Sequence, residues 1–194
     1  FIWKVPDKII VELITISLDP IPEQQLDKKY KMGARTMDQS LIEGTIHEAF
    51  RRIAKKAGDV LAVEDQEGSL TYSQLDSLSD NIAYRLLEQG FVNSRPIAIY
   101  SPHHPLALAI ILGVLKAGGF YLPLDVHLPL DRMTQILEEI QPEIMITSEG
   151  EFEGKSHFDD FGVEILQVET FPLKYRKTQA FPNVSTEAPA CLLY

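Results

Sequence analysis

Residues 96–125 restrict the possible folds of this chain more than any other segment. Pro96–Ser101 is predicted to be a strand, and Leu106–Lys116 is a helix that is apolar on nearly every side. Gly118 and Gly119 allow that helix to end, after which Phe120–Leu124 forms a second strand. A strand, a helix and a strand this close together make a βαβ unit with parallel strands and a right-handed crossover. The helix is too short to cross a bilayer, so we expect it to be buried in protein.

The rest of residues 45–194 continues this alternation. The predicted elements, in chain order, are a helix that Gly58 ends, a hairpin with strands at 60–64 and 69–72, a helix that Gly90 ends, a helix at 130–140, and strands at 143–147 and 163–168. Thr45 and Glu48 predict a capping box on the first helix, and Ser73 is expected to cap the second. The sequence therefore predicts an α/β fold with a mainly parallel sheet flanked by helices.

Three further segments remain: two that are predicted to be irregular and one, at the end of the chain, that is predicted to begin a strand. Residues 149–160 are acidic and contain glycine, which predicts an exposed loop. Residues 171–189 have no periodicity and three prolines, which favours a surface crossing. Ala190–Tyr194 is predicted to start an apolar strand.

Residues 1–44 are predicted to form an irregular N-terminal extension that differs from residues 45–194. Lys8–Leu18 is rich in β-branched residues and is predicted to be one strand. Pro20 and Pro22 then end any regular element, because proline fixes φ and lacks an N–H. The polar stretch that follows is expected to be a linker or the tail of a preceding domain. The chain does not begin with methionine and ends in an apolar run, so we expect both ends to be cut from a longer protein.

The charge balance and the cysteine content exclude several classes of function. The chain has 28 acidic and 18 basic residues, for a net charge of −10, which disfavours binding to nucleic acid or to anionic lipid. Its single cysteine excludes an intrachain disulfide and a multi-cysteine zinc site, and it fits a reducing compartment. We find no signal peptide and no apolar run long enough to span a membrane, so we expect a cytoplasmic protein.

The common catalytic motifs are absent from the sequence. It contains no G-x-G-x-x-G or G-x-x-x-x-G-K-[ST] phosphate loop, no G-x-S-x-G nucleophile elbow and no H-E-x-x-H zinc helix. His103 and His104 could ligate a metal, but adjacent side chains diverge, so histidines at a helix entry are the favoured interpretation. Lys116 could be a catalytic ammonium; the favoured interpretation is a cation that complements the negative end of its helix.

Three other features have a functional and a structural interpretation. Asp125 follows a predicted parallel strand, at the edge where open α/β sheets bind ligands, but a turn aspartate before Pro129 is the favoured interpretation. Leu173–Lys177 mixes cations with a tyrosine, and a solvated face is favoured over a nucleic-acid site. Cys191 lies in an apolar segment and is interpreted as an inert core thiol.

Several segments together resemble one known family. Leu70–Leu75 (LTYSQL) resembles the first core motif of adenylate-forming enzymes, in particular the adenylation domains of nonribosomal peptide synthetases. Leu115–Asp125 (LKAGGFYLPLD) resembles their second motif almost position for position, and Pro129–Arg132 resembles the PxxR pattern that follows. Ala190–Tyr194 is similar to the strand that leads into the family's phosphate loop. The stretch after Asp125 departs from the usual pattern, because Val126–Leu128 replaces a common proline and aromatic residue.

The resemblance implies that residues 45–194 are the first part of an adenylation domain. Such domains join a carboxylate to the α-phosphate of Mg-ATP and pass the acyl group to a phosphopantetheine thiol on a carrier domain. The phosphate loop, the substrate pocket and the C-terminal lysine of the family would lie beyond Tyr194. We therefore assign no catalytic, cofactor-binding or metal-binding residue and expect the chain alone to be inactive. The expected partners are the remainder of the adenylation domain, a carrier domain, a condensation domain and a small amino or carboxylic acid substrate. The alternatives are a piece of an acyl- or aryl-CoA ligase or of a carboxylate reductase, or a noncatalytic docking module.

Overall fold

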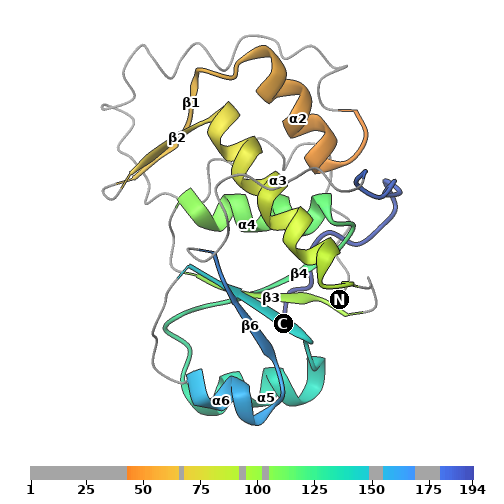
Figure 1. Ribbon diagram of the computed structural model, residues 1–194. Helices are drawn as coiled ribbons and strands as arrows, with labels where there is room; N and C mark the ends of the chain where they lie inside the picture. Colours follow the sequence, from red (N-terminus) through yellow and green to blue (C-terminus); the bar gives the residue numbers. More distant parts are fainter. Residues whose placement is uncertain (1–42, 66–67, 92–94, 102–104, 149–154, 169–179) are drawn as a thin grey trace.

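The computed structural model describes residues 43–65, 68–91, 95–101, 105–148, 155–168 and 180–194 (Figure 1). The predictions for Lys8–Leu18, for His103 and His104 and for Leu173–Lys177 lie outside the described residues. Within the described ranges the predicted α/β fold, a parallel sheet flanked by helices, is confirmed. None of the helices in these ranges has the length and apolar character that a bilayer crossing demands.

Apart from helix α6, the elements follow the order expected from the sequence. The helices are α2 (Ile46–Lys56), α3 (Tyr72–Glu88), α4 (Pro105–Lys116), α5 (Leu130–Ile140) and α6 (Lys155–Asp160). The strands are β1 (Leu61–Glu64), β2 (Ser69–Thr71), β3 (Ile97–Tyr100), β4 (Tyr121–Leu124), β5 (Ile144–Thr147) and β6 (Glu164–Gln167).

Strands β3 to β6 form one parallel sheet in the order β4-β3-β5-β6, and β1 and β2 form a separate antiparallel hairpin. Every residue of β3 and β5 is buried, as expected for central parallel strands that are covered on both faces. Helices α3 and α4 lie on one side of the sheet and α5 and α6 on the other (Figure 1). The β3–α4–β4 unit predicted from residues 96–125 is confirmed, with Ile97 opposite Tyr121.

The described residues form two hydrophobic cores, one on each face of the parallel sheet. The larger core lies between α2, α3, α4 and one face of the sheet, and the smaller core lies between α5, α6 and the opposite face. Met133, Ile136 and Leu137 of α5 are buried, and Ile140 packs against the same core from a partly exposed position.

The helix starts agree with the prediction in one case and differ in the other. The backbone N–H of Thr45 donates to the Glu48 carboxylate at 2.9 Å, as expected for the first helix. The prediction that Ser73 caps α3 was wrong, because Thr71 has the extended backbone of the N-cap. Its hydroxyl accepts from the Gln74 N–H at 3.3 Å, and its own N–H donates to the Gln74 side chain at 2.8 Å. The cap is reciprocal, and α3 begins at Tyr72, two residues before the start that a Ser73 cap would give.

Glycine ends two helices in the left-handed conformation. Gly90 after α3 has φ +75° and Gly118 after α4 has φ +83°, as their positions in the sequence suggested. Gly58 follows α2 but lacks a positive φ. Its role is a close approach, because its carbonyl accepts from the Ser73 N–H at 2.9 Å and an added Cβ would lie 3.4 Å from that of Ser73.

Two predictions near the C-terminus need correction. The exposed loop predicted at 149–160 contains α6 in its described part, and Phe158 of that helix is fully buried against Tyr100. The strand predicted at Ala190–Tyr194 is a single parallel bridge between Cys191 and Tyr121. Residues 180–189 are irregular, as expected for a crossing segment.

Candidate functional site

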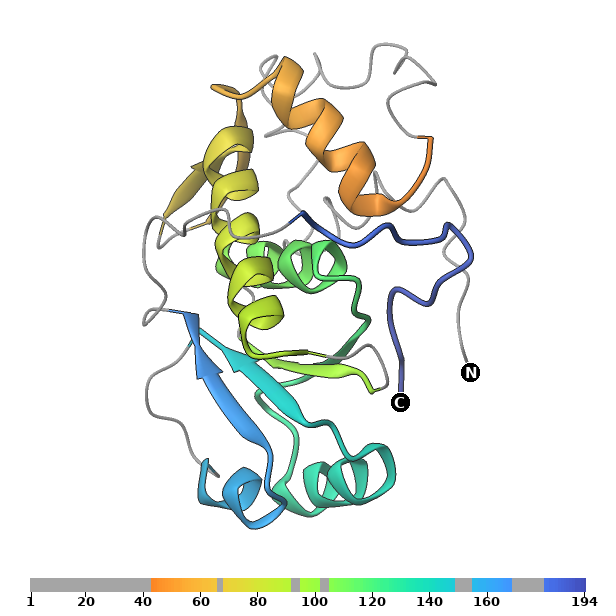
Figure 2. The same cartoon turned by 45° about the vertical axis from the view of Figure 1, so that its right-hand side comes forward.

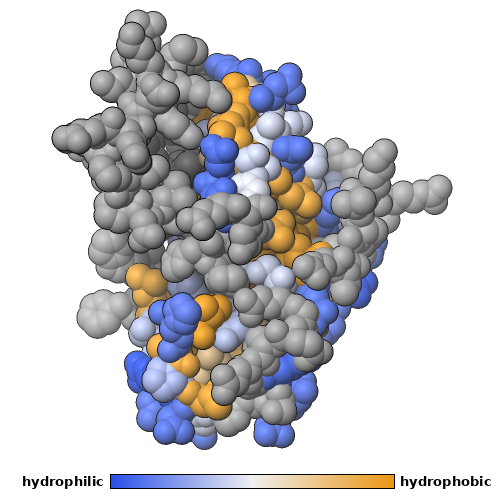
Figure 3. Space-filling view, turned by 90° about the vertical axis from the view of Figure 1, so that its left-hand side faces the viewer, coloured by the Kyte–Doolittle hydropathy of each residue, from blue (hydrophilic) through white to orange (hydrophobic). Residues whose placement is uncertain are grey.

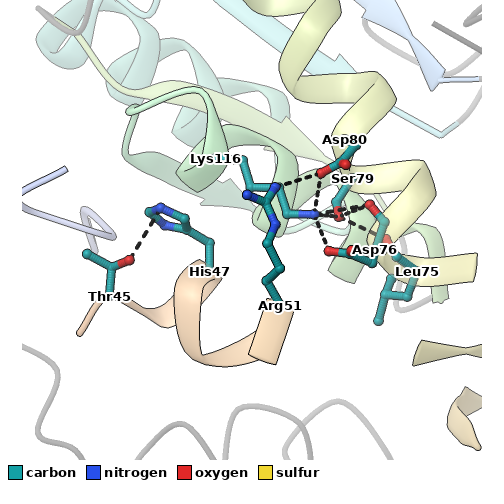
Figure 4. A network of polar contacts seen from close by, with 8 residues as sticks. All are labelled: Thr45, His47, Arg51, Leu75, Asp76, Ser79, Asp80 and Lys116. Atoms are coloured by element: carbon teal, nitrogen blue, oxygen red, sulfur yellow. Dashed lines mark hydrogen bonds and ion pairs between the residues drawn. The ribbon is translucent and has the colours of Figure 1, made fainter. Parts of the chain in front are cut away.

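A fully buried lysine lies where α3 packs on α4. The side chain of Lys116, the last residue of α4, is 0% exposed. Its Nζ donates to the carboxylates of Asp76 at 2.6 Å and of Asp80 at 2.7 Å, and to the Ser79 hydroxyl at 2.7 Å. The backbone carbonyl of Asp76 is a fourth acceptor at 3.0 Å (Figure 4). All these oxygens belong to a single turn of α3, so the ammonium ties the two helices together.

The second cation of the cluster comes from α2. Arg51 donates to the same Asp80 Oδ1 at 3.0 Å, and its guanidinium lies 4.9 Å above the ring of Phe181. The two positive and two negative charges therefore cancel, and their mutual attraction offsets part of the cost of removing them from water. We call Lys116, Asp76, Asp80 and Arg51 the ionic cluster.

The enclosure of Lys116 decides its chemistry. With four oxygens around its Nζ and no exposed surface, the ammonium has no open side for a substrate. Lys116 does lie in the last turn of α4, as the favoured interpretation required, but the sequence analysis did not foresee that its partners lie on α3. The sequence did contain one indication that α3 provides a buried polar partner. Ser79 is a small polar residue on the apolar face of α3, between Leu75 and Ile82, and it is fully buried.

His47 is a buried titratable group that the sequence analysis missed. Its Nε2 lies 3.3 Å from the Thr45 hydroxyl, and only 7% of the residue is exposed. The pKa of His47 is lowered from 6.5 to about 4, chiefly by burial; Glu48 opposes this shift, and the nearby cations Arg51 and Lys116 contribute to it. The imidazole is therefore neutral at pH 7.

The carboxyl edge of the sheet contains the other predicted candidate. The Asp125 carboxylate accepts from the His127 N–H at 2.9 Å, and its carbonyl accepts from the Leu128 N–H at 3.1 Å. This geometry confirms the turn interpretation of Asp125. The hydroxyls of Ser101 and Ser148, which follow β3 and β5, lie 2.7 Å apart at the same edge.

Cys191 has the environment of an unreactive thiol. It lies beside Tyr121 and is partly buried. Burial raises the pKa of the Cys191 thiol, so little of the reactive thiolate is present at neutral pH.

Two cavities in the described part of the chain offer no unpaired cation to the phosphates of ATP. One cavity, of about 310 Å³, has Arg95 as its cation, and Arg95 already faces Glu143 at 3.7 Å. Another, of about 320 Å³, is lined by Leu70, Leu78 and four uncharged polar residues.

Figure 3 shows that apolar side chains gather in patches between hydrophilic ones on one face of the molecule. No group of three or more His, Cys, Asp or Glu side chains in the described ranges could hold a metal ion.

The parallel sheet with helices on both faces defines an open α/β scaffold, in which the ionic cluster links α2, α3 and α4. The chain belongs to the AMP-binding enzyme family, whose model matches residues 50–194. The resemblance to the N-terminal part of a nonribosomal peptide synthetase adenylation domain is thereby confirmed.

Similar proteins include, in the order given below, subunits D and C of the plipastatin synthase of Bacillus subtilis (strain 168). The first is 32% identical over 145 residues, which is 72% of this chain and 4% of the relative. The second is 30% identical over 176 residues, which is 90% of this chain and 7% of the relative. The chain thus spans less than a tenth of the length of these relatives.

Solved structures share the fold. The crystal structure of the nonribosomal peptide synthetase FmoA3 is 25% identical with a TM-score of 0.63, over 75% of this chain and 15% of that one. The N-terminal subdomain of Klebsiella oxytoca NpsA is 17% identical with a TM-score of 0.61, over 73% of this chain and 34% of that one.

Proposed function

We propose that this chain is the first part of an adenylation domain that activates an amino acid or another small carboxylic acid. In that reaction the carboxylate joins the α-phosphate of Mg-ATP, pyrophosphate leaves, and the acyl group then moves from AMP to a carrier-bound phosphopantetheine thiol. The observation that carries the proposal is the family match over residues 50–194, together with the similarity to peptide synthetases.

The role that we propose for residues 45–194 is a scaffold. The second family motif, Leu115–Asp125, forms the end of α4, the Gly118 turn and strand β4, and its charged residues serve the fold. Lys116 is enclosed and Asp125 is held in a turn. We therefore propose that no catalytic, cofactor-binding or metal-binding residue lies in this chain. Residues 1–44 are proposed to be an extension that belongs to a linker or to a preceding domain.

Substrate-dependent ATP–pyrophosphate exchange tests this proposal. The purified 194-residue chain should give no exchange above the enzyme-free background with a panel of amino and aryl acids. The longer parent protein should exchange with at least one of them. Exchange catalysed by the 194-residue chain would show that we have placed the chemistry wrongly.

The acceptor thiol distinguishes this function from its alternatives. We expect the parent to load a carrier domain in cis or in trans, which mass spectrometry detects as an acyl-phosphopantetheine adduct. Efficient transfer to free coenzyme A would instead indicate a CoA ligase, NADPH-dependent release of an aldehyde would indicate a carboxylate reductase, and a parent without exchange would indicate a docking module. A cytoplasmic location is part of the proposal, because carriers and ATP are available there and the lone Cys191 suits reducing conditions.

A further inference from the structure

Residues 180–194, which we call the C-terminal crossing, run from the layer of α2 and α3 to the edge of the sheet (Figure 2). At its start, the ring of Phe181 stacks on Tyr84 with 4.7 Å between centroids and lies under the Arg51 guanidinium. At its end, the Leu192 N–H donates to the Tyr121 carbonyl of β4 at 2.8 Å. The crossing is therefore attached at its start to helices that the ionic cluster joins and at its end to strand β4, which follows α4 in the chain.

The two carboxylates of the ionic cluster differ in their second partner. Both bind the Lys116 ammonium at nearly the same distance, 2.6 Å for Asp76 and 2.7 Å for Asp80. Only Asp80 also accepts from Arg51, the residue that covers Phe181. A continuous set of contacts thus leads from buried Lys116 through Asp80 and Arg51 to the crossing.

We propose that Asp80 is a positioning residue that orients Arg51 over Phe181 and so fixes the C-terminal crossing on the scaffold. A guanidinium has a long, flexible side chain, and its attraction to an aromatic face depends on its lying over the ring. Without the Asp80 carboxylate, Arg51 loses the charged acceptor that holds it there. The segment that follows Tyr194 would then start from a less defined position. That this segment handles the phosphates of ATP rests on the proposed function.

The chain supplies a matched control. Asp76→Asn and Asp80→Asn each remove one of the two carboxylate charges from the same buried ammonium at nearly equal distances. A general loss of stability at the α3–α4 contact should be similar in both variants. An effect confined to Asp80→Asn therefore reports the connection to Arg51.

Hydrogen exchange in the longer parent protein measures this connection directly. The reporter is the Leu192 amide, which is bonded to Tyr121. Asp80→Asn and Arg51→Gln should each speed its exchange about tenfold, the loss expected from one charged hydrogen bond, relative to amides of α5. Asp76→Asn should leave that ratio unchanged. The double variant Arg51→Gln/Asp80→Asn should exchange no faster than Asp80→Asn alone.

Kinetics of the parent give a second readout. Asp80→Asn should raise the KM for ATP several-fold more than Asp76→Asn does, because a displaced crossing weakens binding before it affects chemistry. Equal effects of the two substitutions on Leu192 exchange and on KM would overturn the proposal.

If Asp80→Asn does not fold, Phe181→Leu provides the same test with the ionic cluster intact, and unchanged Leu192 exchange in that variant would also overturn it. A wild-type parent without exchange activity would refute the proposed function, while the hydrogen-exchange result would still decide the role of Asp80.

Discussion

The ammonium of Lys116 is sealed from solvent while its carboxylate partners are not, and this difference predicts an unequal response to mutation. The lysine side chain is 0% exposed, whereas the side chains of Asp76 and Asp80 are 23% and 30% exposed. An ammonium that loses both counter-charges cannot reach water. Carboxylates that lose the ammonium can hydrate, and Asp80 also retains Arg51 at 3.0 Å.

The expected magnitudes follow from that contrast. Replacing both acids, in Asp76→Asn/Asp80→Asn, leaves an uncompensated buried charge and should lower the free energy of unfolding by about 3–5 kcal/mol. Lys116→Met keeps a chain of similar length in the core. The two carboxylates that lose the ammonium can hydrate, and the buried Ser79 hydroxyl still donates to the Leu75 carbonyl at 2.8 Å. The cost of Lys116→Met should be about 1–3 kcal/mol. The double acid variant should therefore be less stable than Lys116→Met by about 2 kcal/mol.

Urea unfolding of the 194-residue chain, followed by far-ultraviolet circular dichroism, measures both values. The midpoint should move while the m value stays constant, which identifies a change in stability and not in the denatured state. Lys116→Ala is a useful comparison, because it adds a cavity and should be less stable than Lys116→Met. If Lys116→Met proves at least as destabilising as Asp76→Asn/Asp80→Asn, our account of the burial asymmetry is refuted.

Three other predictions address single features. Because the pKa of His47 is lowered from 6.5 to about 4, protonation of His47 favours the unfolded state. The contribution of neutral His47 to the free energy of unfolding is complete above pH 6.5, and this free energy should fall by about 3 kcal/mol as the pH drops from 6.5 to 4. His47→Gln should flatten that slope in urea titrations at several pH values. In Gly113→Ala the new Cβ would lie 2.6 Å from the Ile82 side chain, so the variant should lose about 1–3 kcal/mol, whereas Gly68→Ala, with open space around it, should change stability by less than about 0.5 kcal/mol. Thr71→Ala removes the cap of α3 and should lower stability by about 1 kcal/mol, seen as a lower melting temperature.

Each of these has an outcome that contradicts it. An unchanged pH slope in His47→Gln would mean that another group is responsible for the acid sensitivity. Gly113→Ala as stable as Gly68→Ala would mean that α3 and α4 can separate without loss. A melting temperature of Thr71→Ala equal to that of wild type would mean that Ser73 or water replaces the cap.

The sequence was most informative where a local pattern and the tertiary contacts agree. The β3–α4–β4 unit was predictable because an apolar helix between two apolar strands has few ways to bury its surface. Gly90 and Gly118 end their helices as predicted, since left-handed φ values favour glycine. Helix α6 was missed because its charges suggest a solvated loop, and only the burial of Phe158 against the sheet makes the segment helical.

The ionic cluster was not predictable in the same way, because its members are far apart in sequence. Lys116 lies 40 residues from Asp76 and 36 from Asp80. A lysine at a helix end has a simple local interpretation, and nothing local to α4 contradicts it. The contrary signal was on another helix, where Ser79 interrupts an apolar face.

The arrangement of α3 and α4 explains why a buried charge is useful here even if apolar residues could be as stable. Helix α4 is apolar nearly all round, so hydrophobic burial alone does not decide which of its sides faces α3. Gly113 and Lys116 are three residues apart and so share one side, and they meet Ile82 and Ser79, which are likewise three apart on α3. The glycine leaves room for Ile82, and the ammonium requires oxygens that occur on one turn of α3. Rotating or sliding α4 would place an unpaired cation among apolar side chains, at a cost of several kcal/mol. Since α4 continues through Gly118 into β4, the same pairing determines where the edge that binds Leu192 lies.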